Sequence, residues 1–161
     1  PRLIIPFLDQ QGNLFGYQGR ALSSKSTLRY ITIMIDDSMP KLFGLDEVDV
    51  SKTVYVTEGP IDSMFVDNCI AMAGSDLAGI QASEKVVMIY DNEPRNKQIV
   101  NYIDRLISKG CSVCIWPQNV KEKDINDMIY TKTAKEIKKI IDDNTYAGLE
   151  ARMHFRNWRR V

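Results

Sequence analysis

Carboxylate side chains follow two strand-like apolar runs of this sequence, and their positions suggest chemistry on phosphate groups. The runs span residues 53–57 and 85–90, and the acidic residues at or just past their ends are Glu58, Asp62, Asp91 and Glu93. Open α/β sheets bind ligands at the carboxyl ends of their strands. Carboxylates gathered at such an edge repel one another, and a divalent cation relieves that cost. The pattern therefore indicates phosphate chemistry assisted by metal ions.

Within these two loops, Glu58 is the sharpest single candidate. It directly follows a β-branched strand and precedes Gly59, whose backbone can approach a ligand closely. A general base or a metal ligand fits that setting, and so does a helix N-terminal acid that interacts with the helix dipole. Asp91 and Glu93 are two residues apart, so in an extended loop both point to one side and can share a magnesium ion. An acidic pair in a loop is also common as plain solvated turn chemistry.

A third acidic turn follows the last strand of the expected sheet. It reads Lys123-Asp124-Ile125-Asn126-Asp127 and precedes an expected helix. Taken alone, this turn is also explained as a helix N-cap, because Asp and Asn are preferred at that position. Three acidic turns at successive strand ends of one sheet are much less expected by chance than one. Together they favour metal-assisted phosphoryl chemistry.

Basic and aromatic side chains in the front third offer contacts to phosphates or bases. Arg20, Lys25, Arg29 and Tyr30 lie in or beside β-like segments. Arginine presents planar donors to phosphate, and tyrosine can stack on a base or sugar. From spacing alone, an ordinary solvated basic face is the favoured interpretation of this group.

The last segment, residues 151–161, contains arginines and aromatic residues but no acid. A helical wheel puts the four arginines on one side and Ala151, Phe155 and Trp158 on a neighbouring side. This pattern favours an amphipathic helix that packs its aromatic side chains on the domain, and a nucleic-acid or partner surface is the alternative. His154 has no evident partner and is expected to be a surface residue.

The elements that position these residues fall into three expected parts. Residues 1–50 are β-rich and expected to be antiparallel, whereas residues 51–130 alternate strands and helices, which favours right-handed βαβ units on a parallel sheet. Residues 131–161 are expected to be helical. The expected fold class is therefore α/β, with a parallel sheet flanked by helices, a small antiparallel β-rich subdomain before it and C-terminal helices after it. The expected strands are 3–8, 14–17, 28–33, 53–57, 70–73, 85–90 and 111–116, and the expected helices are 61–68, 77–83, 94–109, one around 137–141 and one from about 146.

Composition limits the function classes. The 161 residues carry no net charge, with 44% apolar and 26% charged residues, so the chain is not a general polycation. No apolar run approaches the roughly 20 residues that span a bilayer, so no membrane partner is expected. Three cysteines form no disulfide framework, which suggests a reducing compartment such as the cytoplasm. Cys111 and Cys114 are expected to be buried strand cysteines rather than a zinc site. Because the chain starts at Pro1 inside a strand-like run, we expect it to be part of a longer protein.

The order of these motifs resembles the Toprim domain that bacterial and phage primases share with topoisomerases and some nucleases. That domain carries a glutamate after its first strand and a D-x-D after a later one, and the corresponding positions here are Glu58 and Asp91-Asn92-Glu93. Segments outside these loops are similar to DnaG-type primases or to the K-D-x-N motif of phage primases. These segments are 2–20, Arg29-Tyr30, 42–45 and 123–127.

The resemblance implies the catalytic core of a phage-type DNA primase, a nucleotidyltransferase of the DNA-directed RNA polymerase type that makes short RNA primers on single-stranded DNA. It implies that Glu58, Asp91 and Glu93 act in catalysis and bind Mg²⁺ or Mn²⁺, with Asp62 and Asp124 as further metal-site residues. The residues implied to bind nucleotide or template are Arg20, Arg29, Tyr30, Lys123 and Asn126. The implied partners are a single-stranded DNA template and nucleoside triphosphates, with a replicative helicase as a candidate. The alternatives are a metal-dependent Toprim nuclease and a non-catalytic nucleic-acid-binding Toprim module.

Overall fold

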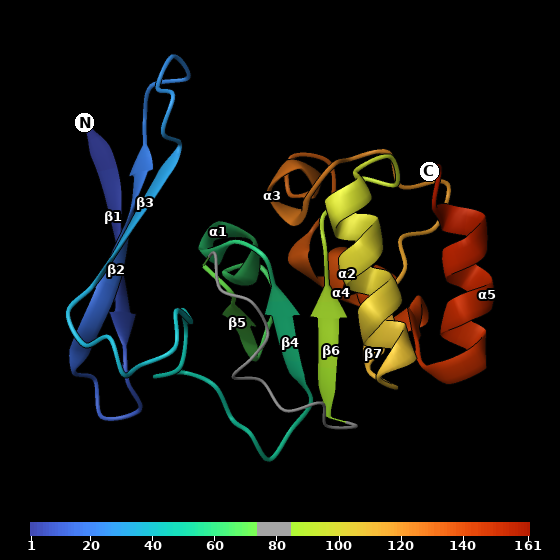
Figure 1. Cartoon of the computed structure of the whole chain (residues 1–161), viewed down its shortest axis with the longest axis horizontal. Coiled ribbons are helices and arrows are strands. Elements are labelled where there is room, and N and C mark those ends of the chain that lie inside the picture. The colour runs from blue at the N-terminus through green and yellow to red at the C-terminus, as the bar shows by residue number, and fades with distance from the viewer. Residues whose placement is uncertain (74–84) are drawn as a thin grey trace.

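The computed structural model describes residues 1–73 and 85–161, which form two β-sheets with helices around the larger one (Figure 1). The smaller sheet is antiparallel, with the order β1-β2-β3, and consists of β1 (Arg2–Leu8), β2 (Leu14–Ala21) and β3 (Tyr30–Met34). The larger sheet has the order β5-β4-β6-β7-β8 and consists of β4 (Val54–Thr57), β5 (Cys69–Ala71), β6 (Val86–Ile89), β7 (Ser112–Cys114) and β8 (Thr145–Tyr146). An antiparallel front sheet beside a mainly parallel sheet confirms the expected α/β class.

A tight turn joins β1 to β2 and sets the register of the front sheet. The Asp9 carboxylate accepts hydrogen bonds from two backbone N–H groups of the turn, at 2.9 and 2.8 Å, and Gly12 takes a φ of +81°. The register that follows puts Arg20 of β2 opposite Tyr30 of β3. The expected strand pair is confirmed, and the third strand begins two residues later than expected.

The parallel strands β4 and β6 carry the two acidic loops at the centre of the larger sheet. All four residues of β4 are buried, as is typical of a central parallel strand. Thr57 at the end of β4 pairs with Ala71 of β5 and with Ile89 of β6. Because this register ends the strands at one edge of the sheet, Glu58 and Asp91 leave the sheet close together.

The helices cover the larger sheet and bury apolar faces against it. The helices in the described residues are α1 (Pro60–Ser63), α2 (Lys97–Ser108), α3 (Ile125–Met128), α4 (Ala134–Asp143) and α5 (Gly148–Trp158). Helix α2 packs beside α5 (Figure 1), and its buried residues are Ile99, Val100, Ile103, Leu106 and Ile107. Asn96 caps α2 by accepting the backbone N–H of Gln98 at 3.1 Å. Gly110, at a φ of +79°, follows the end of this helix.

Two apolar clusters hold the molecule together. The main one lies between the larger sheet and its helices. The second is small: Ile5, Phe7, Phe15 and Ala73 are its buried residues, and Met34, Met39, Phe43, Leu45 and Ile61 pack against them. Ile61 belongs to α1, so this small cluster ties the front sheet to the helix that follows Glu58.

Helices α1 and α2 differ in their bounds from the sequence-based expectation. Helix α1 covers four residues instead of 61–68, because the backbone after it makes successive i→i−3 hydrogen bonds and Asn68, at a φ of +54°, turns the chain into β5. Helix α2 begins at Lys97 rather than at Pro94, because the Asn96 side chain caps the helix at that point.

The C-terminal part contains a strand that we did not expect. Residues Thr145–Tyr146 form β8, which pairs antiparallel with β7 before α5 begins, so the last helix starts two residues later than expected. The expected turn at Gly74-Ser75 and the expected helix at 77–83 lie outside the described residues.

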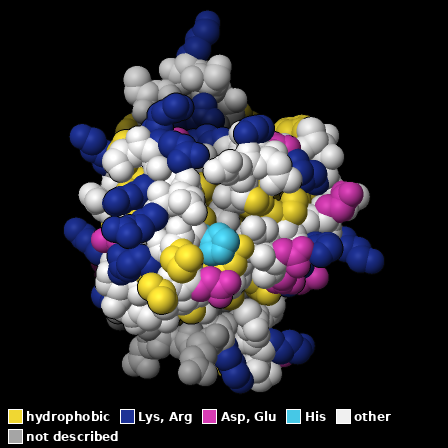
Figure 2. Space-filling model, turned by 90° about the vertical axis from the view of Figure 1, so that its right-hand side faces the viewer, with side chains coloured by type: hydrophobic (Ala, Val, Ile, Leu, Met, Phe, Trp, Pro, Cys, Tyr) yellow, Lys and Arg dark blue, Asp and Glu magenta, His cyan; other side chains and the backbone are white. Residues whose placement is uncertain are grey.

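Helix α5 packs its aromatic side chains on the domain, as expected. Ala151, Phe155 and Trp158 are buried, and Arg152 pairs with Asp104 of α2 at 2.9 Å. His154 is exposed, but the expectation that it lacks a partner is wrong: its ring stacks on Tyr146 with 3.8 Å between the centroids. Figure 2 shows this side of the molecule, with the histidine among apolar side chains and with Lys and Arg side chains gathered to one side.

The C-x-x-C cysteines are core residues. Cys114 lies in β7 and Cys111 just before it, and both are buried free thiols, which confirms the expected burial. Burial raises the pKa of Cys114. In the described parts of the chain, every helix is too short or too polar to cross a membrane.

Candidate metal and nucleotide site

Glu58 and Asp91 meet at the carboxyl edge of the larger sheet. The backbone N–H of Asp91 donates a hydrogen bond to Glu58 Oε1 at 3.0 Å. This bond joins the loops after β4 and β6, which lie 33 residues apart in sequence. The strand register thus brings together the two acidic loops that the sequence placed at separate strand ends.

Asp62 joins the same cluster from α1. Gly59 and Pro60 turn the chain from β4 into this helix, and a Cβ added to Gly59 would stand 3.2 Å from Asp62 Oδ2. This close approach favours glycine at position 59. Asp62 Oδ1 accepts the backbone N–H of Asn126 at 2.9 Å, so Asn126 reaches the site through its backbone.

Asp124 caps α3 and belongs electrostatically to the acidic cluster. Its Oδ1 accepts the backbone N–H of Asp127 at 2.8 Å, which confirms the N-cap interpretation. Burial raises the pKa of Asp62 and of Asp91, and the charge of Asp124 adds to the shift of both. The helix cap and a place in the acidic cluster are therefore compatible for this residue.

Lys123 places an ammonium group between the two carboxylates of the second loop. Its Nζ is 3.7 Å from Asp91 Oδ2 and 3.7 Å from Glu93 Oε1. The expectation that Asp91 and Glu93 face the same side is therefore confirmed. Burial opposes the charge of Lys123, but the surrounding carboxylates, led by those of Glu93 and Asp91, raise its pKa.

The carboxylates of this site lie in an environment that disfavours negative charge. Burial is the largest cause that raises the pKa of Glu58 and of Asp62. Burial, followed by the charges of Glu58, Asp62 and Asp124, raises the pKa of Asp91 to about 7. Lys123 compensates this negative charge only in part, and a bound divalent cation would relieve the remainder.

The residue types fit a hard divalent cation. Within residues 1–73 and 85–161, no three Asp, Glu, His or Cys side chains stand close enough to enclose a metal ion. The contacts give the reason, because Glu58 and Asp62 accept backbone N–H groups and Lys123 lies between the other two carboxylates. The donors are nevertheless all carboxylate oxygens, which suit Mg²⁺ or Mn²⁺ better than a softer metal.

The acidic cluster forms one wall of a cleft whose other wall is the front sheet. The cleft has a volume of about 760 Å³. Its lining includes Arg20, Arg29, Tyr30, Glu58, Asp62 and Asp91. The Arg20 guanidinium lies 5.8 Å from the centroid of the Tyr30 ring, within cation–π range. The structure therefore brings Arg20 and Arg29 to the acidic site, which spacing alone did not indicate, whereas Lys25 is not among the residues that line the cleft.

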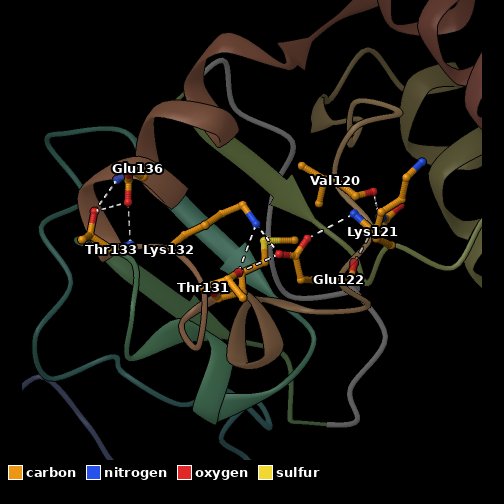
Figure 3. A network of polar contacts seen from close by, with 9 residues as sticks. Val120, Lys121, Glu122, Thr131, Lys132, Thr133 and Glu136 are labelled. Carbon is orange, nitrogen blue, oxygen red and sulfur yellow. Dashed lines mark hydrogen bonds and ion pairs between the residues drawn. The ribbon is translucent and has the colours of Figure 1, made fainter.

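Glu122 anchors the loop that carries Lys123 (Figure 3). Thr131 Oγ1 donates to Glu122 Oε1 at 2.8 Å, and Lys132 Nζ pairs with the same oxygen. The Lys132 contact is the largest cause that lowers the pKa of Glu122 to about 2. The ionised Glu122 side chain therefore fixes residues 120–123 against the turn that precedes α4.

Sequence reasoning missed Asn92, the middle residue of the second acidic loop. Its Nδ2 donates to the backbone carbonyls of Val120 and Glu122, each at 3.1 Å, and its Oδ1 accepts the indole N–H of Trp158 at 3.0 Å. The signal that could have found it is a neutral amide between two acids, since an amide can bridge backbone groups without adding charge.

Metal binding at this site is expected to strengthen between about pH 5.5 and about pH 7.5. Because the pKa of Asp91 is raised to about 7, its protonation competes with the metal below that pH, at a cost of up to about tenfold per pH unit. The raised pKa of Asp91 also contributes to the stability of the metal-free fold. This contribution to the free energy of unfolding is fully present below pH 3.8, the ordinary pKa of the group, and is lost as the pH rises through about 7. Differential scanning fluorimetry should show Mn²⁺ raising the unfolding midpoint more at the higher pH. Asp91→Asn should remove this difference, and an equal Mn²⁺ shift at both pH values in the unmodified chain would contradict the expectation.

The fold and the arrangement of the acidic loops are similar to those of the Toprim-containing catalytic cores of DnaG-type primases. The Aquifex aeolicus primase, with its zinc-binding and RNA polymerase domains, matches with a TM-score of 0.67 and 25% identity, over 90% of this chain and 41% of that chain. The Escherichia coli primase catalytic core matches with a TM-score of 0.65 and 18% identity, over 88% and 52%. The RNA polymerase domain of Mycobacterium tuberculosis DnaG, solved with a double-stranded DNA oligomer that has a 6-nucleotide overhang, gives 0.71 and 15%, over 93% and 55%.

In sequence, the chain is similar to a phage primase. It is 35% identical over 166 residues to the DNA primase of Enterobacteria phage T4. The match covers 100% of this chain and 48% of the T4 protein, so the chain spans about half the length of that relative. No protein-family model matches the chain. The resemblance to the Toprim-containing cores of DnaG-type and phage DNA primases, expected from the motif order, is confirmed.

Proposed function

We propose that this chain is the catalytic core of a DNA primase, which makes short RNA primers on single-stranded DNA by metal-dependent nucleotidyl transfer. The observation that carries the proposal is the cleft between two unlike walls. One wall has the carboxylates that follow β4 and β6, and the other has Arg20 of β2 and Arg29, which directly precedes β3. Similarity to the T4 DNA primase and to primase catalytic cores supports it. The proposed division of the chain is 1–50 for the front subdomain, 51–130 for the Toprim domain and 131–161 for the C-terminal segment.

The proposed metal-site residues are Glu58, Asp91 and Glu93, with Asp62 and Asp124 as further members. Bound Mg²⁺ or Mn²⁺ would supply charge for a triphosphate and for the attacking hydroxyl oxygen. The raised pKa of Asp91, caused first by burial and then by neighbouring carboxylates, supports this assignment. Lys123 already lies beside Asp91 and Glu93, so it is placed to neutralise phosphate charge next to them.

The basic wall of the cleft is proposed to hold the triphosphate and the template. Arg20 and Arg29 offer guanidinium donors to phosphate oxygens, and Tyr30 offers a ring that can stack on a base. Asn126 contributes by fixing Asp62 through its backbone N–H. In the reaction, a 3′ hydroxyl gives up its proton to water and its oxygen bonds to the α-phosphorus of the incoming nucleotide, while the bond to the pyrophosphate oxygen breaks. The arginines and Lys123 balance the negative charge that moves to the leaving pyrophosphate.

Primer synthesis in vitro tests this proposal. The protein is given single-stranded DNA, labelled ribonucleoside triphosphates and either Mg²⁺ or Mn²⁺, and the products are separated by size. Short labelled RNA that depends on both template and metal supports the primase assignment. Shortened template without new RNA would instead indicate a Toprim nuclease, and template binding without either product would indicate a non-catalytic module. Adding a replicative helicase to the same reaction tests that candidate partner through a change in primer yield.

A further inference from the structure

The middle residue of the second acidic loop is bound on three sides. The backbone N–H of Asn92 donates to the carbonyl of Lys123 at 2.6 Å, and its side-chain Nδ2 donates to the carbonyls of Val120 and Glu122. All of these acceptors belong to the 120–123 loop, which the Glu122 carboxylate anchors to the turn before α4 (Figure 3). The loop that carries Asp91 is therefore bonded to a platform that is itself fixed.

The third side of Asn92 is held by the C-terminal helix. Trp158 at the end of α5 donates its indole N–H to Asn92 Oδ1 at 3.0 Å. An indole can only donate, so the accepting atom of Asn92 must be the oxygen, and the amide nitrogen must face the carbonyls of the platform. The backbone N–H of Arg160 also donates to the carbonyl of Pro94, at 2.8 Å, just past Glu93. Residues 158–160 thus contact the acidic loop at two points.

These bonds act against the repulsion inside the site. Asp91 and Glu93 flank Asn92, and a carboxylate oxygen of each lies 3.7 Å from the same Lys123 Nζ, so two like charges stand close together in this loop. Lys123 offsets part of the repulsion between the two carboxylates, and a restraint on the loop backbone is needed against the rest. The Asn92 bonds supply that restraint without adding a charge, and Trp158 is buried, with 7% of its surface exposed, so its end of the contact is held by the core.

We propose that Asn92 and Trp158 are positioning residues that hold Asp91 and Glu93 ready for a divalent cation, which makes α5 part of the active centre. The inference rests on the proposed function, because it concerns the same metal site. Residues that orient metal ligands through hydrogen bonds change metal affinity by about 10–100-fold when they are replaced. This range sets the expected effect.

Trp158→Phe is the first test, because it removes the indole N–H and keeps an aromatic side chain in the core. Mn²⁺ affinity, measured by electron paramagnetic resonance of the free ion, should fall by about 10-fold or more. Phe155→Leu is the matched control: Phe155 lies next to Trp158 in the same core and stacks on it, with 6.2 Å between ring centroids. The control should lose some thermal stability and keep the Mn²⁺ affinity of the unmodified chain.

Asn92→Ala is the second test and leaves the core intact, so it decides the question if Trp158→Phe does not fold. Asn92→Ala should weaken Mn²⁺ binding at least as much as Trp158→Phe does. The double variant should bind Mn²⁺ no more weakly than Asn92→Ala alone, because both changes break the same hydrogen-bond network. Asn101→Ala on the exposed side of α2 controls for loss of an asparagine. Unchanged Mn²⁺ affinity in Asn92→Ala and Trp158→Phe overturns the positioning role while the primase proposal stands. An unmodified chain that binds no Mn²⁺ overturns both.

Discussion

Glu58→Gln is expected to lower metal-dependent nucleotide incorporation by at least about a hundredfold, comparable to the loss of one electrostatic stabiliser of a transition state. The folded chain should remain at least as stable as the unmodified one when metal is absent. Burial is the largest cause that raises the pKa of Glu58, and the charges of Glu93 and Asp62 add to it, so a neutral side chain of the same shape relieves a cost. Glutamine also keeps an oxygen that can accept the Asp91 N–H.

Three measurements separate the two effects of Glu58→Gln. Primer synthesis reports catalysis, the unfolding midpoint without metal reports the fold, and the rise of that midpoint with Mn²⁺ reports metal binding. Glu150→Gln, which removes an exposed carboxylate from the first turn of α5, should leave all three close to the unmodified values. Primer synthesis that continues unchanged in Glu58→Gln would remove this residue from the catalytic site.

Phe7→Ala is expected to destabilise the front sheet by about 3–5 kcal/mol and to disable the cleft without removing the acidic site. Phe7 has 0% of its surface exposed and packs against Phe15 and Phe43, at centroid distances of 6.1 and 6.4 Å. It belongs to the small apolar cluster rather than to the main core, so the loss falls on the contact between the front sheet and α1. The wall that carries Arg20 would then no longer be held opposite Asp62.

Hydrogen exchange locates the damage that Phe7→Ala causes. Amides of β1 and β2 should exchange faster, whereas those of β4 and β6 should keep most of their protection, because local opening follows cooperative units. Primer synthesis should fall strongly, and Mn²⁺ affinity should stay within about threefold, since no proposed metal-site residue lies in the front sheet. Leu3→Ala on the same strand is the control: Leu3 is 45% exposed, so its loss should cost little. Equal loss of protection in both sheets would show that the two clusters unfold as one.

The parts of the site that could be predicted from the sequence depend on local pattern. The apolar runs that became β4 and β6 are short, buried and β-branched, and parallel pairing alone puts Glu58 near Asp91. The cap made by Asp124 follows from its residue type before a helix. Each of these features is settled within a few residues of sequence, or by a general rule of sheet construction.

The parts that could not be predicted depend on contacts between distant segments. The bond between Asn92 and Trp158 spans 66 residues, and no periodicity in either segment encodes it. Helix α2 was expected to begin at Pro94 because proline suits the first turn of a helix. It begins three residues later because the Asn96 side chain accepts the backbone N–H of Gln98 and caps the helix there. The two-residue strand β8 is too short for a pattern and exists because β7 offers it an edge.

The bond between Trp158 and Asn92 has a consequence for the order in which the protein is made. A ribosome adds about 5–20 residues per second, so the 66 residues between these partners take roughly 3–13 s to synthesise. During that time both acidic loops have already been translated, but the indole that secures the second one does not yet exist. With the proposed role of Asn92 and Trp158, we expect the affinity for a metal ion to reach its full value only after α5 has been made. A nascent chain that stalls before α5 would then carry the acidic residues but bind the ion more weakly.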